Sequence, residues 1–321
     1  MSKEKLGFIG LGTMGFAMCY GLYKSGYSMV LPTYRRQIDQ SCSFIPLAPN
    51  EEAKTALYDE MLNNGCEGAA DTAEQFAKSD FILISMPTSK QVEMNAYGEA
   101  GILENAKPGT IVIDLTSADP VSTRKICADA EKKGIDWLDC PISGGYAGAT
   151  AQTLAVMVGG KQEAFEKAKP ILETLGDPKK VTFVGPSGAG NTLKSVNNYL
   201  STTCLLATTE GLMVAAKAGI DPMVAAKVIN GGGGASNATS NKYPNYIFNG
   251  AGLKMTVDLM LKDVNLYCQA AKAGKVPAFL GNTVHQIAEI PSATGKGNQD
   301  WIEYVRLYEE WCGEKVIGIE K

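Results

Sequence analysis

Histidine is almost absent from this sequence of 321 residues, and His285 is its only representative. It lies in a helix-like run from Asn282 to Ile290, so we expect it to pack rather than to react. Mechanisms that move a proton through a histidine–carboxylate pair are therefore disfavoured. Any general acid or base must be another kind of side chain.

The cysteine pattern lacks any Cys-x-x-Cys pair, although the chain has eight cysteines. Zinc and dithiol motifs need such spacing, so the cysteines are interpreted as core thiols of a reducing compartment, and we predict no metal site. Cys140 stands beside a glycine-rich loop and could be a nucleophile. No histidine lies near it in sequence to activate it, which makes that role unfavourable.

Strong charge and long apolar runs are also missing. The formal net charge is −4 and no lysine–arginine run occurs, so we expect no nucleic-acid partner. No apolar run approaches the ~20 residues that span a bilayer, so we expect no membrane association. The start Met-Ser-Lys-Glu-Lys leads almost at once into a strand, which predicts a cytoplasmic protein without a targeting peptide.

Strand-like and helix-like runs alternate through the first part of the chain. This alternation predicts an α/β domain with a doubly wound Rossmann-type sheet over residues 1–185. The strand signal then disappears, which predicts an all-α domain over residues 186–321, entered by a long helix from Asn191 to Lys217. Its further helices are expected at Pro222–Ile229, Lys254–Ala273, Val276–Ile290 and Trp301–Tyr308.

A glycine signature follows the first apolar run. Gly10-Leu11-Gly12-Thr13-Met14-Gly15 fits GxGxxG between a strand and a helix-compatible stretch. In that context Gly10 permits the turn, Gly12 lets the backbone reach a pyrophosphate, and Gly15 lets helix and strand pack closely. The sequence therefore predicts a dinucleotide cofactor.

The end of the second strand bears on which dinucleotide is bound. An acidic residue there would bond the ribose hydroxyls and repel a 2′-phosphate, but the sequence reads Thr33-Tyr34-Arg35-Arg36 and its first acid is Asp39. Guanidinium groups suit a phosphate, so NADP is favoured over NAD, with NAD still possible. Alternatively, Arg35 and Arg36 simply begin a solvated helix.

Two later segments carry polar groups suited to a small carboxylate substrate. Ser143, Gly144 and Gly145 form a loop that exposes a hydroxyl and backbone N–H groups, although a plain tight turn would look the same. Lys194 and Asn198 stand four residues apart, and so share one face of the long helix. Lys194 could be a general acid/base if its surroundings lowered its pKa from ~10.4 to ~7.5, at a cost of about 4 kcal/mol. An ordinary surface lysine is the alternative.

Together these segments resemble the β-hydroxyacid dehydrogenase family, which includes 3-hydroxyisobutyrate dehydrogenase and tartronate semialdehyde reductase. The likeness spans nearly the whole chain: the Gly10–Gly15 signature, the Asp139–Gly145 element, the Gly190/Lys194/Asn198 element and the pair Lys262-Asp263. It implies an NADP(H)-dependent oxidoreductase that interconverts a small 3-hydroxy acid and its semialdehyde.

The resemblance also implies roles for individual residues. Lys194 would donate or accept the proton, Asn198 would orient it, and Ser143 to Gly145 would bind the substrate carboxylate. Lys262 would lie near both nicotinamide and substrate. Further positions along the cofactor path would be Met86, Pro87, Gln91 and Ser117, which follow two predicted strands.

The long helix is apolar over much of its circumference, which predicts burial on several sides. A homo-oligomer, dimer or tetramer, through the helical domain explains this and matches the family's habit; burial between the domains of one chain is the alternative. The segment between Arg36 and Gly65 is longer than the family leads us to expect, and Gln152 stands where glycine is common. An imine reductase-like enzyme and a catalytically idle cofactor-binding module remain alternative functions.

Overall fold

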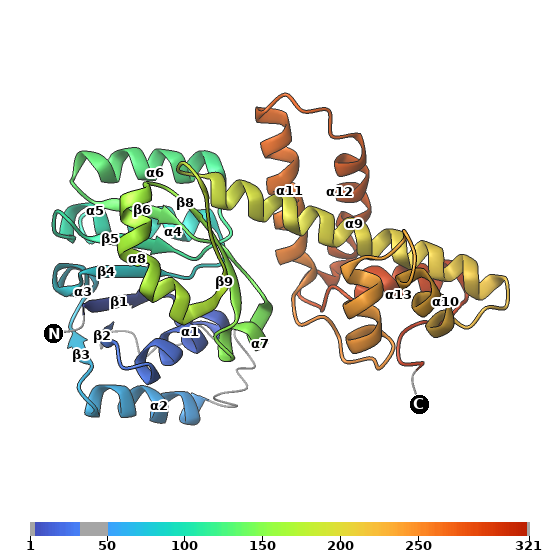
Figure 1. Ribbon diagram of the computed structural model, residues 1–321, viewed down its shortest axis with the longest axis horizontal. Helices are drawn as coiled ribbons and strands as arrows, with labels where there is room; N and C mark the ends of the chain where they lie inside the picture. Colours follow the sequence, from blue (N-terminus) through green and yellow to red (C-terminus); the bar gives the residue numbers. More distant parts are fainter. Residues whose placement is uncertain (1–3, 33–50, 320–321) are drawn as a thin grey trace. The chain divides into compact units, whose positions relative to one another are not determined.

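The computed structural model describes residues 4–32 and 51–319 of the chain. It divides into two compact units, Met1–Lys194 and Ser195–Lys321, which are called here the sheet unit and the helical unit. The division falls inside one continuous helix, α9 (Ala189–Lys217). Each unit is described by itself (Figure 1).

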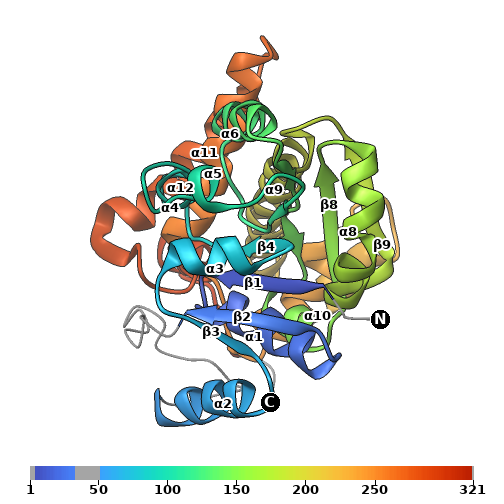
Figure 2. The same cartoon turned by 90° about the vertical axis from the view of Figure 1, so that its left-hand side faces the viewer.

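The sheet unit is built on six parallel strands in the spatial order β3-β2-β1-β4-β5-β6. This is the order of a dinucleotide-binding Rossmann sheet, so the predicted doubly wound α/β class is confirmed. Figure 2 shows β3, β2, β1 and β4 side by side. The six strands are β1 (Lys5–Ile9), β2 (Ser28–Pro32), β3 (Glu67–Ala69), β4 (Phe81–Ile84), β5 (Ile111–Asp114) and β6 (Asp136–Asp139).

Three further strands extend this sheet beyond β6. β8 (Leu154–Gly159) pairs antiparallel with both β6 and β7 (Ile142–Ser143), whereas β9 (Gly176–Gly185) pairs parallel with β8. The short strands β3 and β7 were not predicted from the sequence. Each has no more than three residues, which is too short for a clear alternation of apolar side chains.

Helices cover both faces of the sheet because alternate residues of its central strands are apolar on both sides. Leu83, Ile113 and Leu138 belong to one buried cluster, with side chains from α1 and α8. Ile82 and Val112 belong to another, with side chains from α3 to α6. The helices are α1 (Thr13–Lys24), α2 (Glu51–Asn63), α3 (Thr72–Lys78), α4 (Ser89–Ala96), α5 (Ile102–Asn105), α6 (Pro120–Lys132), α7 (Gly145–Thr150) and α8 (Gln162–Leu175).

The helical unit contains the rest of α9 and six further helical segments. They are α10 (Pro222–Asn230), η1 (Ala238–Ile247), α11 (Val257–Ala273), α12 (Phe279–Pro291), η2 (Ser292–Lys296) and α13 (Glu303–Cys312). The predicted start of α11 at Lys254 was wrong by three residues. Lys254 has a φ of +63°, and Thr256 caps the helix by accepting a hydrogen bond from the Leu259 N–H.

Two points about the described residues bear on function. No helix among them is both long and apolar enough to cross a membrane. Within the same ranges, no cluster of three or more histidine, cysteine, aspartate or glutamate side chains could hold a metal ion.

Candidate active site

The predicted cofactor-binding loops meet at one edge of the sheet. β1, β4, β5 and β6 are neighbours and run parallel, so the loops that follow them leave from the same edge. These loops contain Gly10 to Gly15 after β1, Met86 and Pro87 after β4, and Ser117 after β5. The structure therefore brings together three segments that the sequence separates by as many as about a hundred residues.

The glycine turn after β1 has space for no larger residue at two positions. Gly10 has a φ of +86°, and a Cβ atom there would lie 2.1 Å from the Ser85 carbonyl oxygen. A Cβ atom on Gly15 would lie 1.8 Å from the carbonyl oxygen of Gly10. The close packing of strand, turn and helix thus depends on these two glycines.

The N-terminus of α1 has no side-chain cap, because its N-cap residue is Gly12 and its first turn contains no acid. Other helices of the unit do have one. Asp71 caps α3 and Asp119 caps α6 by accepting backbone hydrogen bonds. Thr13 and Met14 occupy the first turn of α1, which is half-buried at the edge of the sheet. An uncapped helix N-terminus beside a glycine turn fits the pyrophosphate of a dinucleotide.

The loops after β4 and β5 are joined by a hydrogen bond from the Met86 N–H to the Thr116 hydroxyl at 3.1 Å. Gln91 lies in α4, where its side-chain oxygen accepts a hydrogen bond from the Thr88 hydroxyl. At the same edge, Leu11 is half-buried and Pro87 is exposed. Three predicted cofactor residues, Thr33, Tyr34 and Arg35, lie outside the described residues.

Ser143 closes β7 by pairing with Ala155, and two glycines follow it. Gly144 has a φ of +136° and Gly145 a φ of +61°, conformations that side chains other than glycine rarely adopt. Both glycines are exposed, and Ser143 is half-buried. Cys140, in the same loop, is fully buried, and burial raises the pKa of its thiol well above the ordinary value, which argues against a nucleophilic role.

Asp139, at the end of β6, binds the start of α9. Its two carboxylate oxygens accept hydrogen bonds from the Gly188 and Asn191 N–H groups, each at 2.8 Å. The sequence drew attention to Asp139 only as part of a motif, and gave no signal for Asn191. Their contact joins parts of the chain some fifty residues apart, beyond the range of local patterns.

Asp139 has a buried carboxylate neighbour on the adjacent strand, since Asp114 of β5 is its register partner. Burial raises the pKa of Asp114 to about 7, although the Thr116 N–H donates to this carboxylate at 3.0 Å. Burial likewise raises the pKa of Asp139 to about 6, against the effect of its backbone hydrogen bonds. Two neighbouring carboxylates are thus buried at the ends of β5 and β6, where burial disfavours their ionised form.

Lys194 and Asn198 lie on α9 with side chains 9% and 6% exposed, so neither is an ordinary surface residue. Asn198 Nδ2 donates to Asp263 Oδ2 at 2.5 Å, and its Oδ1 accepts from Asn197 at 3.0 Å. Lys262, beside Asp263 on α11, forms an ion pair with that carboxylate at 3.1 Å. Asp263 therefore fixes which way the Asn198 amide points.

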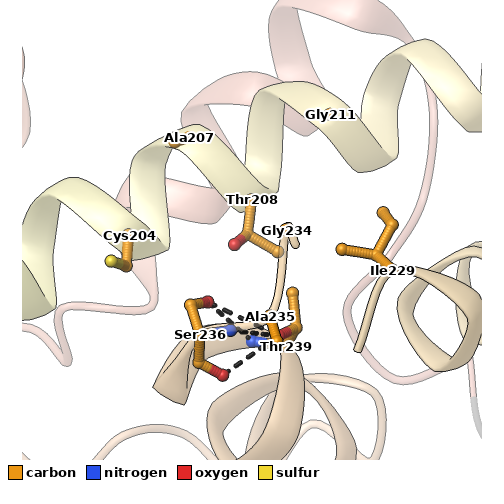
Figure 3. A pocket seen from close by; sticks show the side chains of 9 residues that line it. All are labelled: Cys204, Ala207, Thr208, Gly211, Ile229, Gly234, Ala235, Ser236 and Thr239. Carbon is orange, nitrogen blue, oxygen red and sulfur yellow. Dashed lines mark hydrogen bonds between the residues drawn. The ribbon is translucent and has the colours of Figure 1, made fainter. Parts of the chain in front are cut away.

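Ser236 lies in the glycine-rich segment between α10 and η1, away from the residues described above. Ser236 and Thr239 cap one another through backbone N–H and side-chain hydroxyl groups. They line a cavity of about 280 Å³ under α9 (Figure 3), together with Cys204, Ala207, Thr208, Gly211, Ile229, Gly234 and Ala235. Cys204 is ten residues beyond Lys194, or about 15 Å along the helix. This cavity is accordingly not assigned to the candidate active site.

Comparison with known protein families gives two adjoining matches. Residues 5–185 match the NAD-binding domain of 6-phosphogluconate dehydrogenase. Residues 188–308 match the NAD-binding region of NADP-dependent 3-hydroxyisobutyrate dehydrogenase. Together these matches cover nearly all of the described chain.

Individual relatives are similar over almost their full length. The 2-(hydroxymethyl)glutarate dehydrogenase of Eubacterium barkeri is 34% identical, over 98% of each chain. The 2-hydroxy-3-oxopropionate reductase of Escherichia coli is 32% identical, over 97% of this chain and 99% of its own. The solved 3-hydroxyisobutyrate dehydrogenase of Mycobacterium tuberculosis with L-serine superposes with a TM-score of 0.79 at 25% identity, over 95% and 99% of the two chains.

Proposed function

As a member of the β-hydroxyacid dehydrogenase family, this chain is a nicotinamide-dependent oxidoreductase of small 3-hydroxy acids and their semialdehydes, and we propose that Lys194 is its general acid and base. The observation that carries the proposal is the position of Lys194. Its buried side chain follows, within one helical turn, the point where α9 is bound to the carboxyl edge of the sheet.

In the proposed reduction, the Lys194 ammonium donates a proton to the substrate carbonyl oxygen; in oxidation the neutral amine accepts the alcohol proton. When bound, the nicotinamide supplies or accepts the hydride. Ser143 and the N–H groups of Gly144 and Gly145 hold the substrate carboxylate. Asn198, oriented by Asp263, orients the Lys194 amine, and Lys262 helps to bind the substrate.

The test of this proposal is Lys194→Ala. We expect kcat to fall at least ~100-fold, because general acid/base groups contribute about 10² to 10⁴, while the KM for the cofactor changes less than about two-fold. Leu193→Ala is a matched control, since Leu193 lies next to Lys194 on α9 and is 42% exposed. A Lys194→Ala enzyme with near-normal kcat would exclude the role.

For the cofactor we propose NADP(H) in preference to NAD(H). The sequence supports this through Arg35 and through the lack of an acid at the end of β2. Replacement of Arg35 by alanine should then raise the KM for NADPH at least about ten-fold, as expected for a lost charge-assisted hydrogen bond, and leave the KM for NADH nearly unchanged. Equal losses for both cofactors, or a wild type that prefers NADH, would contradict the preference.

The substrate is proposed to be a short carboxylic acid with a hydroxymethyl or aldehyde group. Two relatives, a 2-(hydroxymethyl)glutarate dehydrogenase and a 2-hydroxy-3-oxopropionate reductase, support that class, but the substrates in their names differ at the far end. NADPH oxidation should be measured with a panel of semialdehyde acids that vary only at that end. Activity on neutral ketones alone would exclude the class.

We also propose that the enzyme is a homo-oligomer joined through the helical unit. Large apolar side chains are exposed there, including Val214 of α9 at 70%, Val228 of α10 at 71% and Phe279 of α12 at 84%. Exposed apolar groups of this size are typical of subunit interfaces. Light scattering at micromolar concentration should give a multiple of 34.1 kDa, and a fully active monomer would contradict the proposal.

A further inference from the structure

The start of α9 is capped by a residue from another part of the sheet unit. Gly188 precedes the helix and Asn191 is its third residue. Both N–H groups donate to the same carboxylate, Asp139, which is fully buried at the end of β6. Asp139 therefore satisfies two donors that a helix N-terminus leaves without intrahelical partners.

The side chain of Asn191 makes further contacts that hold the same turn. Asn191 is 1% exposed, and its Oδ1 accepts a hydrogen bond from the Ala118 N–H at 2.9 Å. Its Nδ2 donates to the Thr123 hydroxyl of α6 at 3.1 Å. Asn191 and Lys194 are three residues apart, so they are neighbours on the helix surface.

These contacts continue into the loops that carry the predicted cofactor residues. The Thr116 N–H donates to Asp114, and the Thr116 hydroxyl accepts from the Met86 N–H. Ala118, two residues after Thr116, donates to Asn191. The loops after β4 and β5 and the first turn of α9 thus form one hydrogen-bonded arrangement.

The close packing around this arrangement leaves no space for a side chain at two glycines. A Cβ atom on Gly190 would lie 2.4 Å from the Met157 carbonyl oxygen and 2.6 Å from that of Asp139. A Cβ atom on Gly159 would lie 2.5 Å from Asp139 Oδ1. The helix start rests directly on the backbone of β6 and β8, which is the reason for glycine at both positions.

We propose that Asp139 and Asn191 are positioning residues of the reaction, which hold the first turn of α9 so that the Lys194 amine meets the substrate oxygen. The inference rests on the proposed role of Lys194. Neither residue is assigned a contact with substrate. They affect the rate by fixing the position of Lys194, because a displacement of a catalytic group by about 1 Å can lower the rate up to ~100-fold.

Ionisation of Asp139 is part of this function, since only the carboxylate accepts from both N–H groups with full strength. The titratable groups around it are Asp114 on β5, Cys140 beside it and Cys127 on α6. The Arg124 guanidinium of α6 lies next to Gly188. Because burial raises the pKa of Asp139 to about 6, acidification below that value should weaken the cap.

The test uses Asn191→Ala and the milder Thr123→Val, with Thr123→Ser as the conservative control that keeps the hydroxyl. We expect kcat to fall about 10- to 100-fold in Asn191→Ala, less in Thr123→Val, and hardly at all in Thr123→Ser. The KM for NADPH should stay within about three-fold. If Asn191→Ala does not fold, the two Thr123 variants still decide the matter.

A double-mutant cycle with Lys194→Ala separates positioning from a merely structural role. If Asn191 acts through Lys194, Asn191→Ala should cause no further loss of kcat in the Lys194→Ala background; independent effects would multiply and overturn the inference. In the direction of reduction we expect the kcat of the wild type to fall below about pH 6, and this fall should be absent in Asp139→Asn. A defective Lys194→Ala beside a normal Asn191→Ala would refute only this inference, whereas a normal Lys194→Ala would refute the proposed function itself.

Discussion

Each unit contains buried ionisable groups, and two cases of opposite sign can be compared: carboxylates in the sheet unit and an amine in the helical unit. The sheet unit buries two carboxylates, Asp114 and Asp139, which are 1% and 0% exposed. The helical unit buries an amine, Lys242, which is 6% exposed. Its Nζ donates to the Ser201 carbonyl and hydroxyl at 2.8 and 2.7 Å and lies 4.7 Å from the Trp301 ring centre. No carboxylate among the described residues pairs with it.

Burial acts on both kinds of group in the same way, by disfavouring the charged form. It raises the pKa of Asp114 from 3.8 to about 7, and it lowers the pKa of Lys242 from 10.5 to about 8. At Asp114, the folded sheet unit therefore binds more protons than the unfolded chain does between about pH 4 and 7. At Lys242, by contrast, the folded helical unit binds fewer protons than the unfolded chain between about pH 8 and 10.5.

The sign of the pH dependence differs accordingly. Stability falls with rising pH wherever the folded state holds more protons, and rises wherever the unfolded state does. The contribution of Asp114 to stability should therefore fall as the pH rises from about 4 to 7, whereas the contribution of Lys242 should rise between about pH 8 and 10.5. The effect of burial can therefore be measured on Asp114 and on Lys242 separately, because the two groups titrate in different pH ranges.

The largest effect is expected from Asp114→Asn. The difference in pKa corresponds to up to roughly 4 kcal/mol, so the variant should be more stable than the wild type above pH 7 and no more stable below pH 4. Asparagine keeps the oxygen that accepts from the Thr116 N–H. Urea unfolding can be followed through Trp137 in a Trp301→Phe/Trp311→Phe background. If the free energies of unfolding of the two proteins changed with pH in parallel, burial of Asp114 would not be the cause of the pH dependence.

The same background offers a direct titration. The Trp137 indole N–H is close enough to lower the pKa of Asp114 in part, yet it completes no hydrogen bond of ordinary geometry with a described residue. Trp137 emission should consequently change near pH 7, and Asp114→Asn should abolish the change.

The next effect in size is expected from Lys242→Met. Here the difference in pKa corresponds to up to roughly 3 kcal/mol, so wild-type stability should rise relative to the variant between pH 8 and 10.5. Lys242→Arg is the control, because arginine stays charged and should show no such rise. Unfolding is followed through Trp301 and Trp311, both in the helical unit, in a Trp137→Phe background. A wild type whose stability runs parallel to that of Lys242→Met would contradict the assignment.

The smallest effects should come from exposed charges, and here the units should not differ. Lys161 of the sheet unit is 49% exposed beside Glu131 and Asp136, and Lys217 of the helical unit is 58% exposed beside Glu314. Replacement of either by methionine should cost less than about 1 kcal/mol, and less still in high salt. A larger loss in one unit, measured by the same unfolding experiments, would show that burial is not what separates them.

Local patterns predicted the parts of the molecule that depend on local causes. The alternation of apolar runs predicted the Rossmann sheet, which is confirmed, and the glycine signature predicted the turn after β1. The segment η1 was not predicted from the sequence, because Pro244 within it and the run of glycines before it are typical of breaks between helices. The partners of Asp139 and Lys242 were beyond reach, since they are contacts across some fifty and forty residues of chain.

Gln152 illustrates an intermediate case. The sequence marked it as a departure where glycine is common, and its φ of +55° explains the preference for glycine. Its Nε2 donates to the Thr174 carbonyl at 2.9 Å and to the Ser25 hydroxyl at 3.1 Å. The side chain thereby offsets a backbone strain that the sequence could locate but not account for.

The cysteines of the two units differ in burial, so their thiols should react at different rates. Among the described residues, Cys19, Cys66, Cys127 and Cys140 are buried in the sheet unit, while Cys204, Cys268 and Cys312 are half-buried in the helical unit, and all seven are free. A thiol reagent added to the native enzyme should mark the second group during small fluctuations and the first only when the sheet unit opens. Cys42, the eighth cysteine of the sequence, would be replaced by serine so that only these seven thiols react. The order in which they are labelled would then show which unit opens locally more often.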